Sequence, residues 1–396
     1  MHYLFLEPVD VLFLRANKSF GDPGSYGESM VPPWPSVIAG ALRSRMLADA
    51  GIDLAAFADG RAPHPEIGTP ASPGTFGLCA VQLAQRPSTG VVDPLFPLPL
   101  DLTAEDTGGG VAVLAARPAE LPHALCSSYP LPKHPVIAQS KRGKPAAGLW
   151  LKRAGWQEYL NGKVPGAGQL VSSSDLWKPD PRTGIGLNAH TRSVEEGRLF
   201  TAEAAAFRQQ HHEAGSLTTG FLAAVGGATP PQDGLVRLGA DGRAALVHAL
   251  PDFAPPEPDF EALAASGRCR IVLATPGIFP RGWLPEGVKE QNGQFLFDLH
   301  GVRGRLAAAA VPRAGVVSGW DLAQERPKPA RRAVPAGAVY WLDGVEATPE
   351  ALRELAARGL WSEPCGDPQQ QRAEQQRRAE GFNRIWIAPW CANEGA

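Results

Sequence analysis

The first 51 residues constrain the fold most, because an apolar run, a glycine-rich crossing and a helical pattern follow one another there. Leu, Phe and Val dominate His2–Leu14, which predicts a buried strand with a bend at Pro8. Apolar residues then recur at helical spacing after Ser36, the expected N-cap residue, and Gly51 ends the pattern. We therefore interpret the rest of the chain as an elaboration of one strand, one loop and one helix.

The crossing between this strand and this helix leaves the backbone open to a ligand. Three glycines there have no side chain that would keep a phosphate group at a distance, namely Gly21, Gly24 and Gly27. Basic residues flank them, and the ones that we expect to contact phosphate are Arg15, Lys18 and Arg43. The alternative is that Arg15 pairs with Glu28 or Asp22 and only holds the loop in place.

Composition points to a loop-rich globular protein without a general affinity for polyanions. Glycine and proline together make 83 of the 396 residues, well above the usual share of about 12%. This excess predicts many loops and few long helices, in a chain long enough for two or three domains. The formal net charge is −2, so any nucleic-acid site has to be a local basic track.

The cysteines and the N-terminal sequence indicate a cytoplasmic protein. Five cysteines are spread along the chain and form no C-x-x-C pair that would hold zinc or exchange disulfides. No apolar run approaches the roughly 18 residues of a membrane span, and no signal peptide is recognisable. We expect reduced thiols, a cytoplasmic location and no contact with a membrane.

The stretch at 182–203 predicts an extended hairpin. Two short apolar pieces, Ile185–Leu187 and Leu199–Phe200, bracket a polar tip that contains His190 and Arg192. The residues from Gly184 onward also fit the G-x-G-x-x-A pattern of dinucleotide-binding loops. That pattern needs a buried strand before it and a helix after it, and the polar, charged neighbours of this match predict neither. We therefore expect a hairpin and no nucleotide cofactor.

The second half of the chain predicts a separate α+β domain. An acidic, proline-rich segment at 251–260 indicates a linker. Beyond it, residues 261–396 predict three strands, a helix at 349–359 and a final strand, in the order of a ferredoxin-like half. Residues 1–250 can supply another such half with long insertions. The predicted fold class is therefore α+β, with two ferredoxin-like (RRM-like) domains, long loop insertions and a thumb-like β-hairpin.

Further candidates for nucleic-acid contacts lie in the second half. Arg281 and Trp283 lie on a stiff, proline-containing loop where burial of the indole ring is harder. Arg331 and Arg332 precede a strand, and guanidinium groups bind phosphate oxygens in a bidentate way; a plain surface pair is the alternative. Four tryptophans near glycines, prolines and basic residues suit either base stacking or the core, namely Trp34, Trp283, Trp320 and Trp341.

The sequence predicts no catalytic, metal or cofactor site. His211 and His212 adjoin, and His190 and Glu213 would complete a conceivable cluster. Neighbouring side chains on one element point in different directions, however, so this pattern is poor metal geometry. No G-x-S-x-G elbow, P-loop or H-E-x-x-H motif is present. We expect exposed histidines and a protein that is not an enzyme.

Several motifs carry a family resemblance along nearly the whole chain. They are LEPVDVLFLRANKSFG, PPWPSVIAGALRS, PLFPLPLDL, GIGLNAHTRSVEEGRLFTAE, VRLGADGR, LATPGIFPRGWLP and KPARRAVPAGAVYWL, in this order. Together they resemble the RAMP proteins of CRISPR effector complexes, and within these the third subunit of the type III-B Cmr complex.

This resemblance implies a subunit that binds RNA without cleaving it. Its expected ligand is the repeat-derived 5′ handle of the crRNA, gripped by the hairpin at 182–203 as a thumb, from which Arg192 would close over the RNA. Its expected partners are the large polymerase–nuclease subunit and the backbone RAMP subunit. Two alternatives remain open: a guide-processing endoribonuclease, in which His190 would be the first candidate for acid–base chemistry, and a scaffold that contacts protein only.

Overall fold

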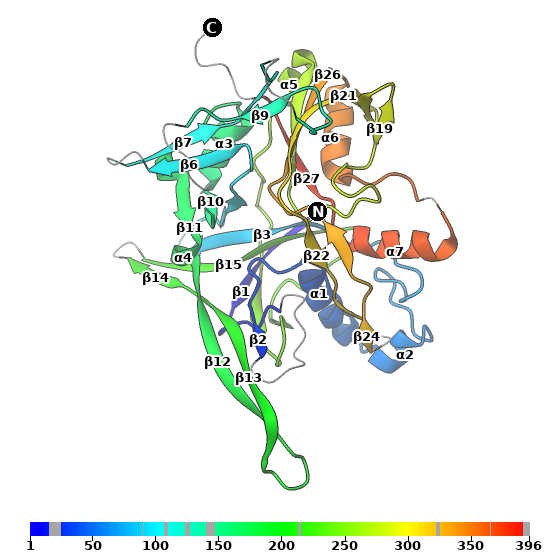
Figure 1. Cartoon of the computed structure of the whole chain (residues 1–396). Coiled ribbons are helices and arrows are strands. Elements are labelled where there is room, and N and C mark those ends of the chain that lie inside the picture. The colour runs from blue at the N-terminus through cyan, green and yellow to red at the C-terminus, as the bar shows by residue number, and fades with distance from the viewer. Residues whose placement is uncertain are drawn as a thin grey trace. The chain divides into compact units, whose positions relative to one another are not determined.

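The computed structural model describes residues 1–15, 25–88, 90–106, 110–122, 127–139, 147–212, 215–321, 325–364 and 366–390 (Figure 1). Lys18 lies outside these ranges. Strands dominate and pair mostly antiparallel in several sheets, with a smaller share of helix, so the fold is of the mixed α and β kind. Within the described ranges, no helix is both long and apolar enough to cross a membrane.

Contacts divide the chain into two units that interleave in sequence. Unit 1 comprises Met1–Pro94, Ser173–Phe253 and Val317–Ala330, and unit 2 comprises Leu95–Ser172, Ala254–Val316 and Arg331–Ala396. The change of unit after Phe253 falls within the linker expected at 251–260. Residues 95–172, which we expected in the first domain, belong to unit 2 instead.

Unit 1 is built on a seven-stranded sheet. Its strands are β1 (His2–Pro8), β3 (Gly77–Pro87), β4 (Asp93–Pro94), β14 (Gln209–His212), β15 (Gly215–Gly226), β16 (Leu235–Arg237) and β17 (Ala244–Ala249). The order across the sheet is β16-β17-β1-β15-β3-β4, with β14 also paired to β15, and neighbours run antiparallel. The predicted first strand therefore lies inside the sheet and ends at the proline.

One long helix packs on this sheet. α1 (Pro35–Asp49) lies against β3 and β16 and buries Ile38, Leu42 and Leu47. The prediction of Ser36 as N-cap is wrong, because the helix begins at Pro35 and no side chain caps it. Proline suits the first turn, since its fixed φ is helical and its missing N–H would have no partner there.

The predicted hairpin is present and belongs to unit 1. β12 (Trp177–Leu187) pairs antiparallel with β13 (Val194–Phe207), from Trp177–Phe207 at the base to Leu187–Val194 near the tip. Figure 1 shows the hairpin (green) reaching well beyond the sheet of unit 1. β13 also pairs in parallel with β2 (Ser25–Gly27), so the end of the glycine-rich crossing lies beside the hairpin.

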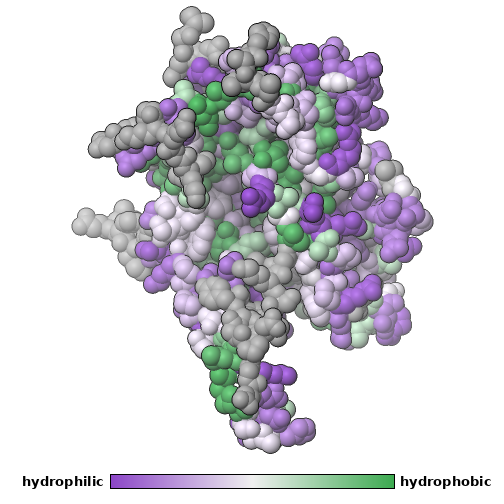
Figure 2. Space-filling model, in the orientation of Figure 1, coloured by the Kyte–Doolittle hydropathy of each residue, from purple (hydrophilic) through white to green (hydrophobic). Residues whose placement is uncertain are grey.

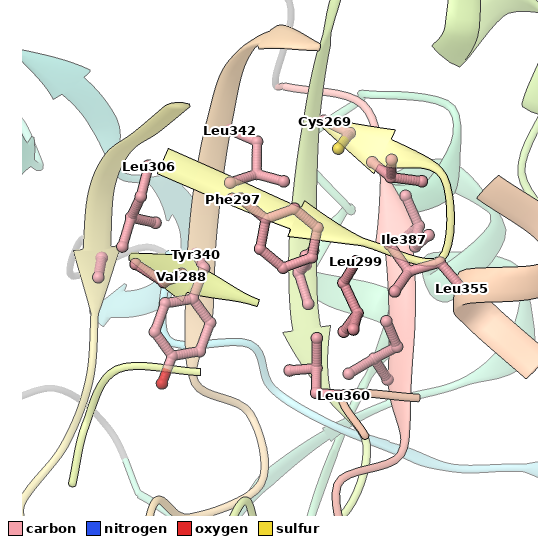
Figure 3. Close-up of a cluster of buried hydrophobic side chains, with 14 of the residues drawn as sticks. Cys269, Val288, Phe297, Leu299, Leu306, Tyr340, Leu342, Leu355, Leu360 and Ile387 are labelled. Carbon is pink, nitrogen blue, oxygen red and sulfur yellow. The ribbon is translucent and has the colours of Figure 1, made fainter. Parts of the chain in front are cut away.

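Unit 2 is built on a six-stranded antiparallel sheet in the order β19-β20-β21-β26-β18-β27. The bounds are β18 (Arg268–Leu273), β19 (Val288–Gln291), β20 (Gln294–Leu299), β21 (Val302–Ala310), β26 (Val339–Glu346) and β27 (Ile385–Ala388). α5 (Phe260–Ser266) and α6 (Pro349–Arg358) pack on one face, over a core that includes Phe297, Tyr340 and Leu355 (Figure 3). α6 confirms the helix predicted at 349–359.

Residues 95–172 cover the other face of β18, β26 and β27, which explains why they belong to unit 2. α3 (Arg153–Leu160) contributes Trp156 to a second core that also contains Val272 and Trp341 from the sheet. Because both faces are covered, β18 is buried from Cys269 to Leu273. Its second half, Ile271–Leu273, is accordingly a continuous apolar run.

A buried ion pair joins this covering layer to the sheet. The side chains of Asp101 and of Arg270, in β18, are both 0% exposed, and Nη1 of the arginine donates to Oδ2 of the aspartate. Tyr159 donates its hydroxyl to Asp101 Oδ1 over 3.0 Å, and its ring centroid lies 4.1 Å from Cζ of Arg270. Each buried charge therefore lies next to its counter-charge, and this offsets the cost of burying it.

The remaining elements are short. In unit 1 they are α2 (Leu54–Ala58), α4 (Ser173–Leu176), β23 (Trp320–Asp321) and β24 (Arg326–Pro327). In unit 2 they are β5 (Phe96–Pro97), β6 (Leu102–Asp106), β7 (Val111–Ala115), β8 (Arg117–Ala119), β9 (His134–Val136), β10 (Leu149–Leu151), the 3₁₀-helix η1 (Ala167–Gln169), β11 (Leu170–Ser172) and α7 (Pro368–Ala379). β22 (Gly315–Val317) pairs with β25 (Arg331–Ala333).

Candidate nucleic-acid interface

One face of the hairpin is apolar and open to solvent. Ile185 lies opposite Leu199 and Leu187 lies opposite Val194, with a register shift between the two pairs. Cross-strand partners share a face, and so do Ile185 and Leu187, which are two residues apart in β12. The exposed fractions of Ile185, Leu199, Leu187 and Val194 are 49%, 53%, 57% and 60% respectively. Figure 2 shows an apolar side on the projecting hairpin, next to a polar side. The sequence analysis interpreted these residues only as strand formers. The spacing of Ile185 and Leu187, two residues apart in a strand, was the signal that these two side chains share one face.

The opposite face of the hairpin explains the glycine pattern. A Cβ atom built on Gly184 would lie 2.5 Å from the ring of Phe200, and one on Gly186 would lie 2.8 Å from the side chain of Arg198. Glycine is therefore needed so that these two cross-strand side chains can lie flat over β12. The G-x-G-x-x-A match lies inside a strand pair with no helix after it, so it is not a dinucleotide-binding loop.

A compact turn presents Arg192 at the tip. The Asn188 side-chain oxygen accepts hydrogen bonds from the backbone N–H groups of His190, over 2.9 Å, and Thr191, over 3.1 Å. The backbone N–H of Arg192 donates to the Asn188 carbonyl over 2.8 Å, and Arg192 has a φ of 55°. Its side chain is exposed and forms no ion pair or hydrogen bond with the described residues. The predicted cation is thus held at the end of the hairpin and stays available.

The segment that carries Arg15 lies beside the base of the hairpin. Leu12 and Ala205 of β13 exchange two backbone hydrogen bonds, over 3.0 and 2.8 Å. Arg15 then bridges to Ser29, whose N–H donates to the Glu203 carboxylate over 3.2 Å. Arg15 is exposed there, next to the strand that leads to the tip. Its role toward phosphate stays a prediction, as does that of Lys18, which lies outside the described residues.

Arg43 has a partner within unit 1. Its guanidinium lies 4.7 Å from the centroid of the Phe76 ring and is only partly exposed. The next cation of the helix, Arg45, bonds Asp49 over 2.6 Å and the Leu235 carbonyl over 2.7 Å. The structure thus gives the α1 cations intramolecular contacts that the sequence did not reveal.

The loop with Arg281 and Trp283 is tied to the core of unit 2. Arg281 donates to the Val288 carbonyl over 3.0 Å. Trp283 is half-buried against the core, and its carbonyl accepts the hydroxyl of Tyr340 over 2.7 Å. Both contacts stabilise the loop, and they leave Arg281 exposed.

Arg331 and Arg332 are the most available cations among those predicted in unit 2. Both are exposed in β25, and neither side chain forms an ion pair or hydrogen bond within the described part of the chain. Of the four tryptophans considered for base stacking, Trp341 is 1% exposed and belongs to the core. Trp34 and Trp283 are half-buried, and Trp320 is 55% exposed.

A groove of about 640 Å³ lies on the open part of the unit 2 sheet. Its lining carries three basic and three acidic side chains, namely Lys289, Arg303, Arg305, Asp298, Asp343 and Glu346. Arg305 and Asp343 form a two-bond pair with distances of 2.9 and 3.1 Å. Because these charges balance, the groove has no net charge that would attract a polyanion.

Of the conceivable histidine cluster, His190 is the member whose side chain the structure describes. Among the described residues, no group of three or more His, Cys, Asp or Glu side chains is placed to hold a metal ion. His190 lies on the exposed hairpin tip, and its ring bonds to no described side chain. Glu213 of the conceivable cluster lies outside the described residues.

Comparison with known proteins identifies the family. The sequence matches the family model described as CRISPR-associated protein (Cas_Cmr3) over residues 4–390. No curated protein matches it. One similar solved chain comes from a cryo-EM structure of the type III-B Cmr-beta complex bound to cognate target RNA and AMPPnP, with 12% identity, a TM-score of 0.49 and coverage of 98% of this chain and 100% of that chain. Another, from Cmr-beta bound to cognate target RNA, has 12% identity, a TM-score of 0.48 and coverage of 97% and 96%. Because the family model spans nearly the whole chain, this protein belongs to the Cmr3 family of CRISPR-associated proteins, which confirms the resemblance carried by its motifs.

Proposed function

We propose that this chain is a non-catalytic subunit that binds the repeat-derived 5′ handle of the crRNA. Its family makes it a subunit of a type III-B CRISPR effector. The handle, the absence of catalysis and the contact surface are our inference. The observation that carries it is the two-faced hairpin β12–β13 with an available cation at its tip.

The hairpin offers an unpaired RNA strand both kinds of contact that such a strand uses. The apolar face formed by Ile185, Leu187, Val194 and Leu199 can pack against splayed bases, and each Å² of apolar surface that it buries contributes about 25 cal/mol. Arg192 at the tip can bind a phosphate oxygen. Unit 1 leaves this apolar face uncovered, so a ligand is the physical reason to present it.

The sheet orders support the finer fold prediction of two ferredoxin-like domains. Such a domain orders its four strands 4-1-3-2, with helices after the first and third strands. Unit 1 has β17-β1-β15-β3 with α1 after β1, and unit 2 has β27-β18-β26-β21 with α6 after β26. We infer that each unit is a ferredoxin-like domain that keeps one of the two helices.

The open sheet of unit 2 is a poor alternative site for RNA. RRM domains stack bases on aromatic side chains of the open sheet face. In unit 2 one part of that face is covered by residues 95–172. The rest carries balanced charges and no exposed aromatic ring among the described residues. This contrast favours the hairpin as the main RNA contact.

The partners that we propose are those implied by the family: the crRNA, the large polymerase–nuclease subunit and the backbone RAMP subunit. The balanced charges of the unit 2 groove suit a protein surface better than a nucleic acid. A subunit with a hairpin for RNA and a mixed-charge groove for protein could bridge its neighbours at the 5′ end of the guide.

The test is the affinity of the purified protein for a labelled RNA with the repeat-derived 5′ end. The variant Ile185→Ser with Leu199→Ser should bind about tenfold or more weakly, since base packing contributes roughly 1–3 kcal/mol per base. Leu235→Ser is the matched control, because Leu235 is also 51% exposed in unit 1 but lies outside the hairpin. Equal affinity of all three proteins would refute the proposal.

The same incubation separates the two alternatives. Cleavage of the RNA that disappears in His190→Ala would support the endoribonuclease. Neither binding nor cleavage, together with incorporation into the effector, would support the protein-only scaffold. We expect protection of the RNA without cleavage.

A further inference from the structure

The hairpin β12–β13 contacts the rest of unit 1 at its base and again farther along β13. At the base, the ring of Phe207 packs edge-to-face against Phe221 of β15, with centroids 5.3 Å apart. Nearer the tip, Ala202 packs against Phe13, in the segment that follows β1. A projecting ribbon that is held only at its base can swing about that point. The contact with Phe13 is therefore suited to fix the direction in which the hairpin points.

Phe13 joins the hairpin to the sheet of unit 1. Its side chain is 7% exposed and forms a small apolar cluster with Ala202 and Ala204 of β13. Its carbonyl accepts the N–H of Ala240, over 2.9 Å, in the turn between β16 and β17. The residue before it exchanges backbone hydrogen bonds with β13. One residue thus contacts the hairpin through its ring and the body of the unit through its backbone.

The sequence of β13 suits this contact. Alanine is depleted in strands, yet residues 204–206 are all alanines and Ala202 precedes them. Ala202 is 8% exposed and Ala204 is 0% exposed, so their small side chains let the ring of Phe13 lie close to the strand. A larger side chain at either position would push the ring away. The alanines therefore serve the packing of the hairpin against its neighbour.

A charged contact lies over the same ring. Cζ of Arg243, in the turn between β16 and β17, lies 5.4 Å from the ring centroid of Phe13, and the guanidinium pairs with Asp10. The pKa of the Asp10 carboxyl is lowered first by a hydrogen bond with the backbone of Val11. The charges of Arg243 and of Arg182, in β12, lower it further. The Asp10 carboxylate therefore attracts both the turn and the hairpin.

We propose that Phe13, together with the Asp10–Arg243 pair, is a positioning residue that fixes the direction of the hairpin and so presents its apolar face and Arg192 to RNA. This inference rests on the proposed RNA-binding function. The ring of Phe13 is buried, so it acts through the hairpin and not by contact with RNA. When only a fraction of molecules holds the binding-competent arrangement, the apparent affinity falls by that fraction.

The first experiment measures the direction of the hairpin without RNA. Nitroxide labels are attached through genetically encoded amino acids at His190 on the tip and at Leu235 on β16, both exposed. Double electron–electron resonance then gives the distribution of distances between the labels. The wild type should give one narrow distribution. Phe13→Ala should broaden it and shift its mean, and Arg243→Gln should broaden it to a smaller extent, because the ring stays packed on the alanines.

The matched control is another phenylalanine of unit 1. Phe253 is 8% exposed and packs with Phe5 and Leu222, in a cluster that contains no hairpin residue. Phe253→Ala removes the same side chain and should leave the distance distribution unchanged. Phe13→Leu keeps an apolar side chain of similar size and should stay close to the wild type. Equal broadening by both alanine variants would mean a general loosening of unit 1, and the inference would be wrong.

The second experiment measures affinity for a fluorescein-labelled single-stranded RNA with the repeat-derived 5′ end. Phe13→Ala should bind about tenfold more weakly if about one molecule in ten keeps the productive direction. Phe13→Leu should recover most of the affinity. Phe253→Ala should bind as the wild type does, at a temperature at which all the variants are folded.

The outcomes separate this inference from the function on which it rests. Unchanged distances in both Phe13→Ala and Arg243→Gln would overturn the inference, whatever the affinity. Broadened distances with unchanged affinity would refute the hairpin as the RNA contact, while Phe13 would still fix its direction. If Phe13→Ala does not fold, Arg243→Gln decides, because its side chain is 25% exposed and its replacement leaves the apolar cluster intact. A wild-type protein without affinity for the RNA would refute the proposed function, and the distances alone would then test the inference.

Discussion

The Asp101–Arg270 pair is a fully buried charged contact between the covering layer of unit 2 and its sheet. Both side chains are 0% exposed, and removal of one leaves an uncompensated buried charge. We expect Asp101→Ala to lower the free energy of unfolding by about 3–5 kcal/mol, and Tyr159→Phe by about 1.5–3 kcal/mol through loss of one hydrogen bond to a charged group. Urea denaturation followed by fluorescence measures both.

The control for this prediction is an exposed ion pair. Arg61 and Asp59 pair over 2.7 Å, with side-chain exposures of 67% and 61%. Arg61→Ala should leave the urea midpoint unchanged, because exposed pairs contribute little. An Asp101→Ala variant as stable as Arg61→Ala would mean that the buried pair does not hold the layer.

Cys269 gives a second residue-scale prediction. Burial raises the pKa of its thiol to about 12, and only the thiolate reacts with alkylating agents. Between pH 7 and pH 9 the native protein should therefore show no iodoacetamide adduct at Cys269 by mass spectrometry, while the unfolded protein is alkylated there. Cys79, which is partly exposed, is the internal comparison. Alkylation of native Cys269 that grows with pH in this window would contradict its burial.

At the scale of elements, the hairpin is the part whose charge can be tested most cleanly. Arg192 has no described partner, whereas Arg182 on the same hairpin bonds Asp180 over 2.9 Å. Arg192→Gln should weaken RNA binding by a similar factor for all sequences and flatten the salt dependence by about 0.7. Arg182→Gln should do less, because its charge is already paired. A larger effect of Arg182→Gln than of Arg192→Gln would place the phosphate near the middle of the hairpin instead of its tip.

The elements that local chemistry determines could be predicted from the sequence. α6 lies between a Thr348 cap and Gly359 as its start and stop signals require. The turn between β16 and β17 uses Asp241 and Gly242 with φ values of 58° and 67°, which suit those two residues. The start of α1 was missed because both Pro35 and Ser36 favour a helix start, and the proline prevailed.

The candidate site was less predictable, because it depends on what the rest of the chain covers. Arg43 and Trp283 have contacts with Phe76 and with the core that no local pattern reveals. Conversely, Leu187 and Val194 look like ordinary strand residues, and only the absence of a covering layer makes them a surface. Whether a side chain stays exposed depends on the tertiary structure, whereas its chemical group can be read from the sequence.

At the scale of the whole molecule, the interleaving of the two units has a consequence for the domain boundaries. Residues 95–172 bury Phe96, Leu151 and Trp156 in a core shared with Val272 and Trp341. A fragment of residues 1–250 would expose that apolar surface, so we expect it to aggregate on size-exclusion chromatography despite the predicted linker. The same fragment without residues 95–172, with 94 joined to 173 by a short linker, should be more soluble. A monodisperse 1–250 fragment with cooperative unfolding would instead support residues 1–250 as one domain, as the sequence predicts.

The most direct test of the central claim is to photo-crosslink the assembled effector, using this protein in its native complex with crRNA that contains 4-thiouridine. Peptides from residues 185–199 should crosslink to nucleotides of the repeat-derived 5′ handle, and Ile185→Ser with Leu199→Ser should reduce those crosslinks while the subunit stays in the complex. Crosslinks of the handle to other surfaces only, with none to the hairpin, would contradict the account.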